Sequence, residues 1–291
     1  GILTTKLFKR EPIKYFRFLL QRGFKIWPSY YTFIILGTLV AYLLYREDYS
    51  NQVIPFSDMK RYLLFYQNYT GEPFHWSFDH IWSLCVEEHF YILLPLLFLI
   101  IRYLGSNRRL LIIALVIVIL LGFFFKFFML NYTIGKDTYS ATHNRIDALA
   151  WGVLLNVIIK LNLFNLRNNP YLSSLFFLGL FGTVLSITAD YQLNSIFYSK
   201  VVYHSILPFF FTLMILGTYF TDLSRLKSIR ILGYYSYNWY LWHPIIVVLI
   251  SQSVGSNWLG LIIYLFLSFA TGVLFTIGIE EPFLRLRKRL L

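Results

Sequence analysis

Two adjacent carboxylates, Glu87 and Glu88, lie in a segment whose neighbouring residues are mostly apolar. A charged side chain inside a membrane costs roughly 2.5–3.5 kcal/mol on insertion scales, so it usually faces a cavity or a polar partner. If the segment is a helix, Ser83, Glu87 and Tyr91 share one face, and Glu88 lies about 100° away. Two interpretations remain: a carboxylate that hydrogen-bonds a neighbouring helix, or a buried acid or base that lines a reaction chamber.

Further polar residues fall at the ends or in the middle of other apolar segments. Arg145 and Asp147 open one segment, where they either form an ion pair that fixes the preceding loop or contact a polar substrate. His243 lies near the middle of another segment, as an interhelical hydrogen-bond donor or as a catalytic group. Glu280 closes the last segment, where the arginines that follow it are candidate charge partners.

Residues 13–27 predict an amphipathic helix that carries four cations, Lys14, Arg17, Arg22 and Lys25, of which the last three are candidate cofactor ligands. We expect this helix to lie on the cytoplasmic membrane surface. The cations either attract anionic membrane lipids or hold the phosphates of a cytosolic cofactor, because guanidinium groups bind phosphate through two parallel hydrogen bonds.

The residue types argue against metal and redox chemistry. The chain has one cysteine, Cys85, so it has no internal disulfide and no cysteine-rich zinc site. His75, Asp79 and His80 are close in sequence, but their spacing matches no specific ligand pattern. We therefore expect no metal.

Membrane-spanning helices must position these polar groups. Of the 291 residues, 57% are hydrophobic and only 14% are charged, which is typical of a chain whose surface faces lipid. Apolar runs long enough to cross a bilayer predict eight spans, at approximately 29–45, 81–101, 110–130, 146–161, 171–189, 201–220, 231–252 and 257–279. We expect an all-α, multi-span helical bundle that forms a single domain over residues 1–291.

The net charge of +12 indicates how the bundle is oriented rather than an affinity for nucleic acid. Nineteen of the 26 Lys and Arg residues lie before residue 28, after residue 284 or in every second loop. Cytoplasmic loops carry such an excess, so both termini are expected on the cytoplasmic side. We expect an integral protein of the cytoplasmic (inner) membrane, with no nucleic-acid partner.

Four stretches resemble motifs of the acyltransferase type 3 family, integral membrane O-acyltransferases that modify cell-surface molecules. They are RGFKIWP from Arg22, WSLCVEEHFYILLP from Trp82, NRIDALAWG from Asn144, and SYNWYLWHP from Ser236 together with EEPF from Glu280. Their order and spacing agree with the family over the whole chain.

The resemblance implies two more spans than the eight counted, and these are expected to precede Gly1. The first of them would carry the catalytic histidine of the family, a role that no residue of this chain is expected to inherit. The activity of the chain without these two spans is therefore left open. Lys25 stands where the basic motif has a second arginine, which keeps the charge but loses the two-bond phosphate geometry.

By resemblance, the reaction is transfer of an acyl group, specifically acetyl, from acyl-CoA to a hydroxyl of a cell-surface carbohydrate or lipid-linked glycan. Arg17, Arg22 and Lys25 would hold the phosphates of acetyl-CoA or another acyl-CoA, and Glu280 would order this basic segment. The acceptor is left open: lipopolysaccharide O-antigen, exopolysaccharide and glycolipid O-acetylation all fit.

The resemblance also implies supporting catalytic roles within the spans. Trp82 and Ser83 would shape the reaction chamber, and Glu87 would orient the base or the acceptor. The other members of this set are Arg145 and Asp147, which would position the sugar, and His243.

A transporter or flippase of a lipid-linked glycan or polar solute is the alternative function. Buried carboxylates among many spans fit that class too. Transporters are often built from inverted repeats with matched broken spans, and the sequence has neither feature.

Overall fold

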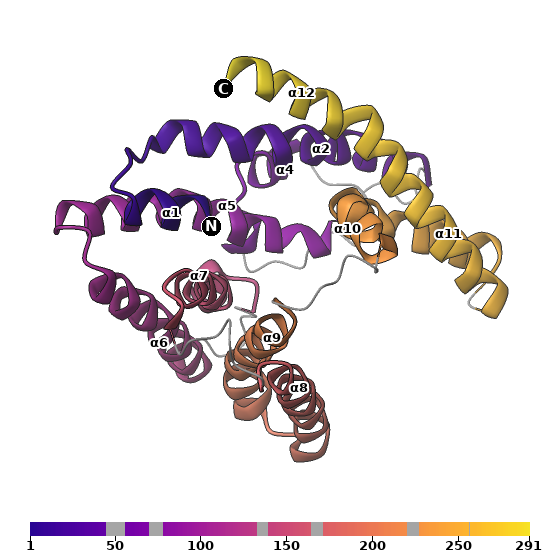
Figure 1. Ribbon diagram of the computed structural model, residues 1–291. Helices are drawn as coiled ribbons and strands as arrows, with labels where there is room; N and C mark the ends of the chain where they lie inside the picture. Colours follow the sequence, from indigo (N-terminus) through magenta and orange to yellow (C-terminus); the bar gives the residue numbers. More distant parts are fainter. Residues whose placement is uncertain (45–55, 70–77, 133–138, 164–170, 220–226, 256) are drawn as a thin grey trace. The chain divides into compact units, whose positions relative to one another are not determined.

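The computed structural model describes residues 1–44, 56–69, 78–132, 139–163, 171–219, 227–255 and 257–291, and the regular elements in these ranges are all helical (Figure 1). The all-α prediction is therefore confirmed. The chain forms two compact units, which are described separately. Unit 1 comprises Gly1–Lys14, Asn68–Gly71 and Cys85–Asp222, and unit 2 comprises Tyr15–Gln67, Glu72–Leu84 and Leu223–Leu291. The prediction of one domain over the whole chain stays a prediction.

Unit 1 consists mainly of long apolar helices. In chain order, its elements are α1 (Ile2–Phe8), α5 (Trp82–Tyr103, in this unit from Cys85), α6 (Arg108–Tyr132), η3 (Thr142–Asn144), α7 (Ile146–Lys160), α8 (Ser174–Leu193), η5 (Tyr198–Tyr203) and α9 (His204–Tyr219). The short η3 directly precedes α7, and the π-helical η5 directly precedes α9.

Small residues let α8 and α9 pack closely within unit 1 (Figure 1). A Cβ added at Gly179 would lie 2.6 Å from the carbonyl oxygen of Phe210, and one added at Gly182 would lie 2.2 Å from the Phe210 ring. Because lipid removes the hydrophobic drive for helices to associate, close backbone contact at small residues stabilises such pairs. This pairing fixes the turn at which α8 ends and η5 begins.

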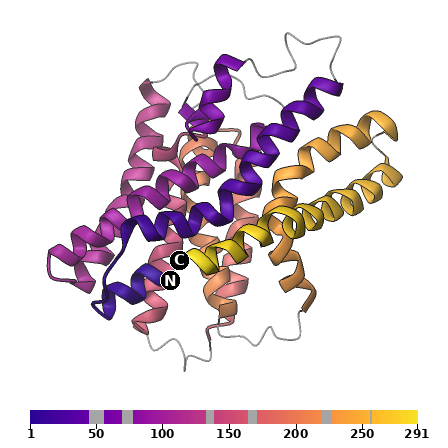
Figure 2. The same ribbon diagram turned by 90° about the horizontal axis from the view of Figure 1, so that it is seen from above.

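Unit 2 contains the remaining elements. They are α2 (Tyr15–Leu44), α4 (Phe56–Leu63), η2 (Asp79–Ile81), α10 (Lys227–Ser253), α11 (Trp258–Phe275), η6 (Thr276–Glu280) and α12 (Glu281–Leu290), while η1 (Gln67–Tyr69) lies on the boundary between the units. Figure 2 shows α10 and α11 as an antiparallel hairpin, with α11, η6 and α12 following one another as one long helical rod.

The predicted surface helix 13–27 and the predicted span 29–45 lie almost entirely in one continuous helix, α2, and the surface location of 13–27 stays a prediction. Pro28 lies inside α2. A proline removes one backbone hydrogen bond of a helix and tends to kink it. Ser29 and Tyr30, which follow it, are 1% and 0% exposed. Tertiary packing at this point therefore maintains the helix through the proline.

Six helical segments in the described ranges are long and apolar enough to cross a membrane: Tyr15–Leu43, Asp79–Tyr103, Arg108–Leu130, Ser174–Leu193, Tyr198–Tyr219 and Trp258–Leu290. They correspond to six of the eight predicted spans. The other two fall on α7, which has only 15 residues, and on α10, whose 27 residues include many polar ones. The total of eight spans stays a prediction.

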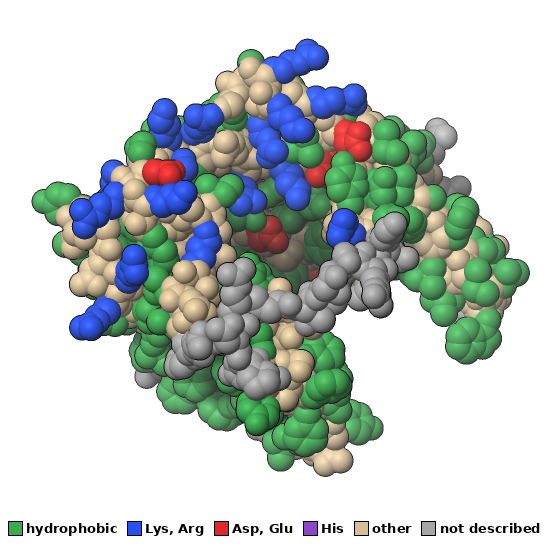
Figure 3. Space-filling model, in the orientation of Figure 1, with side chains coloured by type: hydrophobic (Ala, Val, Ile, Leu, Met, Phe, Trp, Pro, Cys, Tyr) green, Lys and Arg blue, Asp and Glu red, His purple; other side chains and the backbone are tan. Residues whose placement is uncertain are grey.

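The apolar surface of these helices is what a membrane protein requires. Phe181 on α8 and Phe266 on α11 are 65% and 71% exposed, and many other large apolar side chains are similarly exposed. Figure 3 shows hydrophobic side chains covering α8, α9 and α11. Contiguous apolar surfaces of this extent are rare in soluble monomers. The chain is therefore an integral membrane protein.

Candidate active site

A hydrogen-bonded cluster in unit 2 joins the start of α5 to the middle of α10. The hydroxyl oxygens of Ser83 and Tyr240 are 2.6 Å apart, and the Tyr240 hydroxyl donates to the backbone carbonyl of His80. The Ser83 hydroxyl also lies 3.4 Å from the His80 carbonyl oxygen, so both hydroxyls converge on this acceptor. Ser83 is therefore held in a defined orientation by a residue far away in the sequence.

Two histidines of this cluster have defined tautomers. His243 Nδ1 lies 2.7 Å from the carbonyl oxygen of Tyr240, and His80 Nε2 lies 3.1 Å from the carbonyl oxygen of Leu241. Since these oxygens only accept, each of the two nitrogens carries a proton. In a neutral imidazole ring, His243 Nε2 is then the nitrogen that can accept a hydrogen bond. The two ring centroids are 5.2 Å apart.

Aromatic side chains surround the histidines. The fully buried Phe33 ring packs edge-on against His80 and Trp242, with centroid distances of 5.7 and 5.2 Å. Trp242 stacks on Phe275 at 4.1 Å. Trp82 is half-buried at the first position of α5, directly before Ser83. An apolar environment of this kind strengthens the hydrogen bonds that it encloses.

A second polar group in unit 2 links α10 to η6 and α2. The buried Asn238 donates from Nδ2 to Glu280 Oε2 at 3.0 Å and to Thr276 Oγ1 at 3.1 Å. Glu280 is 4% exposed, and the positive charge of Lys25 acts on its carboxylate. Of the arginines expected as partners of Glu280, Arg287 instead donates to the carbonyl of Gln21 at 3.1 Å.

The three cations of α2 form a basic surface rather than one tight cluster. Arg17 is exposed and donates to the backbone carbonyl of Leu291, whereas the guanidinium carbon of Arg22 lies 5.5 Å from the centre of the Phe18 ring. Lys25 is exposed. Their spacing along the chain spreads them around the helix. Figure 3 shows Lys and Arg side chains gathered over α2 and α12.

Of the two adjacent glutamates in unit 1, Glu88 is the more deeply buried. It is 8% exposed, whereas Glu87 is half-buried and accepts a hydrogen bond from the Tyr91 hydroxyl at 3.3 Å. Tyr91 lies one turn further along α5, so this bond ties Glu87 to its own helix. The sequence favoured Glu87 as the functional carboxylate, whereas Glu88 is the more deeply buried of the two.

Asp147 and Arg145 have separate partners in unit 1. Asp147 forms an ion pair with Lys126 on α6, with Oδ2 2.5 Å from Nζ, and Lys126 also donates to the Ser205 hydroxyl at 3.1 Å. Arg145 instead lies over the Tyr139 ring, 3.5 Å from its centre, and donates from Nε to the Tyr139 carbonyl at 2.8 Å. The ion pair that fixes the start of α7 therefore reaches across to α6.

A glycine makes this ion pair possible. A Cβ added at Gly122 would lie 2.6 Å from the Cβ of Asp147, so α6 approaches the first turn of α7 closely at this point. Nearby, in η3, His143 packs edge-on against Phe125 at 5.5 Å. Burial lowers the pKa of His143, so its imidazole is neutral at neutral pH.

A family model described as an acyltransferase domain matches residues 1–279. The chain belongs to the acyltransferase type 3 family. This match assigns it to the acyltransferases, an enzyme class, rather than to the transporters. No curated protein and no solved structure matches the chain.

The predicted site residues of this acyltransferase fall into three groups. Ser83 and His243 meet through Tyr240, with Trp82 adjacent to Ser83 in the chain. Glu280 accepts a hydrogen bond from Asn238 and feels the positive charge of Lys25, whereas Arg17 and Arg22 have other contacts. The third group belongs to unit 1 and comprises Glu87, Arg145 and Asp147.

Several residues that complete these groups in the acyltransferase were not predicted from its sequence. Lys126 had a detectable signal, because it is a charged residue inside an apolar span, like Glu87. Tyr240 and Asn238 lie in the SYNWYLWHP stretch, but nothing in their spacing reveals that Ser83 and Glu280 are their partners. His80 was considered only as a metal ligand, and its companion in that set, His75, lies outside the described residues.

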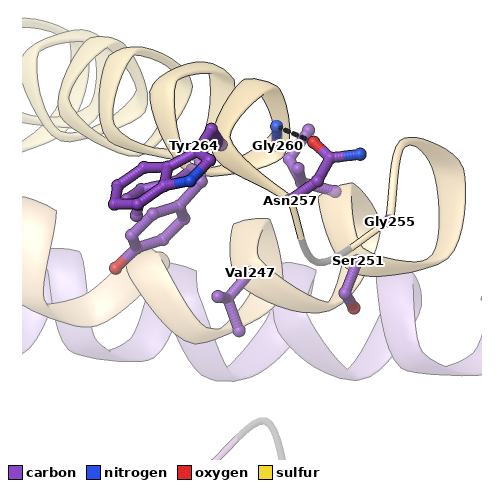
Figure 4. A pocket seen from close by; sticks show the side chains of 9 residues that line it. Val247, Ser251, Gly255, Asn257, Gly260 and Tyr264 are labelled. Carbon is purple, nitrogen blue, oxygen red and sulfur yellow. Dashed lines mark hydrogen bonds between the residues drawn. The ribbon is translucent and has the colours of Figure 1, made fainter.

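A pocket lies at the turn between α10 and α11 of the acyltransferase (Figure 4). Its volume is about 580 Å³, and the nine described residues that line it include Tyr264 but no Asp, Glu, Lys, Arg or His. The Asn257 side chain caps α11 by accepting a hydrogen bond from the Gly260 amide at 2.8 Å. We take the cluster around Tyr240 and His243 as the candidate active site, because it joins Ser83 and His243 of two family motifs.

Proposed function

We propose that this acyltransferase transfers an acyl group, acetyl in the simplest case, from acyl-CoA to a hydroxyl of a cell-surface carbohydrate or glycolipid. The observation that carries the proposal is the family match over residues 1–279 of a chain with many membrane-spanning helices. The choice of donor and acceptor rests on the chemistry of the polar groups in each unit.

The basic surface of α2 supports acyl-CoA as the donor. CoA carries several phosphate charges, and Arg and Lys bind phosphate through short, charge-assisted hydrogen bonds. Arg17 and Lys25 are exposed on α2, and Glu280 acts on Lys25 from within unit 2. The excess of Lys and Arg at the chain ends favours a cytoplasmic location for this surface, where acyl-CoA is made.

The transfer reaction needs a group that takes a proton from the acceptor. The hydroxyl oxygen attacks the thioester carbonyl carbon while its proton passes to a base, and the carbon–sulfur bond then breaks. CoA leaves as a thiolate and takes up the proton. His243 has a fixed ring orientation, because Nδ1 donates to the Tyr240 carbonyl. Its role is a supporting one: Nε2 can accept a hydrogen bond from the acceptor hydroxyl and orient it for transfer.

Radiolabelled acetyl transfer tests this function directly. The full chain, purified in lipid nanodiscs, is mixed with [14C]acetyl-CoA and membrane polysaccharide or glycolipid, and both released CoA and label on the carbohydrate are measured. We expect the two products in equal amounts. The folded protein would disprove the proposal if it released no CoA and labelled no acceptor. Movement of a labelled glycan across proteoliposomes without CoA would instead favour a transporter.

A further inference from the structure

Unit 1 contains a polar pocket that no part of the proposed mechanism uses. Its volume is about 360 Å³, within the range of roughly 300–1,000 Å³ that is typical of small-molecule sites. It lies where α8 ends and η5 leads into α9, and its lining includes Tyr139, Asp190, Asn194, Ser199, Lys200 and His204. Most of its lining side chains carry a hydrogen-bonding group.

The local backbone builds this pocket from a turn and a π-helix. Asn194 follows α8 with a left-handed conformation, φ 44° and ψ 37°, which reverses the chain direction within a few residues. η5 then runs from Tyr198 to Tyr203 as a π-helix. Such wide turns are rare and are frequent at functional sites. The turn places Ser199 and Lys200 beside the last turn of α8.

One carboxylate is fixed within the pocket. The Ser199 hydroxyl donates to Asp190 Oδ1 at 2.5 Å, and the Tyr198 amide donates to the Ser195 hydroxyl at 3.3 Å. A carboxylate has two oxygens and about four lone pairs, so Asp190 has acceptor capacity beyond this bond. It can therefore accept hydrogen bonds from two neighbouring hydroxyls of a ligand.

An aromatic side of the pocket connects it to the family motif in unit 1. The Tyr139 ring contacts His204 edge-on, with centroids 4.9 Å apart, and the Arg145 guanidinium lies over the same Tyr139 ring. Ser205, next to His204, accepts a hydrogen bond from Lys126, which pairs with Asp147. The pocket wall and the start of α7 are therefore one connected structure.

The charges of the pocket indicate a neutral, hydroxyl-rich ligand. Lys200 and Asp190 carry opposite charges, so the lining does not resemble a phosphate site, in which cations dominate. Asn194, Ser195 and Ser199 add neutral donors and acceptors. Few lining residues are apolar, which argues against a lipid chain. A sugar ring matches this pattern, because it presents several hydroxyls to donors and acceptors at once.

We infer that this pocket binds a neutral glycosyl unit of the acceptor. This inference rests on the proposed function for its biological role, but binding of a sugar to the pocket is measurable without acyl-CoA. The site adds a specificity element to unit 1, with Asp190 as the main acceptor of ligand hydroxyl protons.

Saturation-transfer NMR tests sugar binding on the full chain in nanodiscs. The probes are methyl glycosides of glucose, galactose, rhamnose and N-acetylglucosamine. We expect at least one to bind, with Asp190→Asn weakening it about tenfold, because a hydrogen bond to a charged group is lost. Lys200→Gln, which keeps a hydrogen-bonding side chain at an exposed position, should weaken it less. Binding by none of the four probes, or equal binding to both variants, would overturn the inference.

The matched control is Thr188→Ala, two residues before Asp190 on the same helix. Thr188 is exposed, and its hydroxyl donates to the Val184 carbonyl of its own helix at 2.7 Å. This variant should bind the probe as the wild type does. A loss as large as that of Asp190→Asn would show a general effect on α8 and contradict the assignment.

Acceptor kinetics separate this inference from the proposed function. Asp190→Asn should raise the acceptor KM more than it changes kcat. If transfer occurs and the acceptor KM is unchanged in Asp190→Asn, the pocket is not an acceptor site although the enzyme assignment holds. If the wild type binds a glycoside through Asp190 but transfers no acetyl group, sugar binding at the pocket holds and the proposed function fails.

Discussion

Lys126 on α6 and Asp147 on α7 form a buried ion pair, with Nζ 2.5 Å from Oδ2 and side-chain exposures of 3% and 2%. Desolvating two charges is costly, and the pair is stable only because each partner compensates the other. Lys126 also donates to Ser205 on α9, so the starts of α7 and α9 both contact the same ammonium group. His204, the first residue of α9, lines the proposed sugar pocket.

Removing one partner of this ion pair should strongly destabilise unit 1. Lys126→Met leaves the Asp147 carboxylate buried without its cation, and we expect a loss of about 3–5 kcal/mol. Thermal unfolding in detergent, followed by intrinsic fluorescence, measures the change. The double variant Lys126→Met/Asp147→Leu should recover part of the loss, because neither charge is then left alone. A single variant as stable as the wild type would contradict this account.

Gly122 should tolerate no side chain. In Gly122→Ala the added Cβ would overlap Asp147, forcing α6 and α7 apart and disturbing the ion pair. We expect a destabilisation of about 1–3 kcal/mol from overpacking, measured by the same thermal unfolding. Gly152→Ala on α7 is the matched control, because no described atom lies within 4 Å of its added Cβ. That variant should be neutral or slightly stabilising, since alanine favours helix over glycine.

Tyr240→Phe should weaken the cluster that holds Ser83. The variant removes the hydroxyl that links Ser83 to the His80 carbonyl, and we expect a loss of about 1–3 kcal/mol in stability because buried polar groups lose their partner. Ser83→Ala should cost less, since Tyr240 still donates to His80. A double-mutant cycle on thermal stability gives the coupling between the two residues. Additive effects would mean that the hydrogen bond contributes nothing.

His243→Asn separates a structural role of this histidine from a chemical one. An asparagine amide can donate to the Tyr240 carbonyl from near the Nδ1 position, but it has no base at the Nε2 position. We expect normal folding and a fall in kcat of about 10²-fold or more. His243→Gln, which places its amide near Nε2, should be equally inactive. Wild-type kcat in the asparagine variant would remove His243 from the reaction.

Acyl-CoA should lose affinity when the basic surface of α2 is reduced. For Arg22→Ala and Lys25→Ala we expect CoA binding to weaken about three- to tenfold, as partly screened charge-assisted hydrogen bonds are lost. Isothermal titration calorimetry with CoA and with 3′-dephospho-CoA identifies which phosphate is involved. Arg109→Ala, an exposed cation of unit 1, is the control. If Arg109→Ala weakened CoA binding equally, the attraction between CoA and the cations of the protein would be nonspecific.

The class of the protein could be predicted from local features of the sequence. The low content of charged residues and the apolar runs of helical length establish a membrane bundle, because each span must satisfy its own backbone hydrogen bonds in lipid. Motifs such as WSLCVEEHFYILLP predict the family, and the match over residues 1–279 confirms it. Helical spacing also places Glu87 and Tyr91 on one face, where the structure has them hydrogen-bonded.

Partners far apart in the sequence could not be predicted in this way. Asp147 pairs with Lys126 rather than with the neighbouring Arg145, and Ser83 pairs with Tyr240, 157 residues later. By residue type alone, each of these side chains could pair with many other polar residues of the chain. Close helix contacts, such as the one at Gly122, select among them. The sequence by itself determined a helical membrane acyltransferase, and tertiary packing decided which polar side chains meet, because a buried charge is stable only where the fold brings its partner.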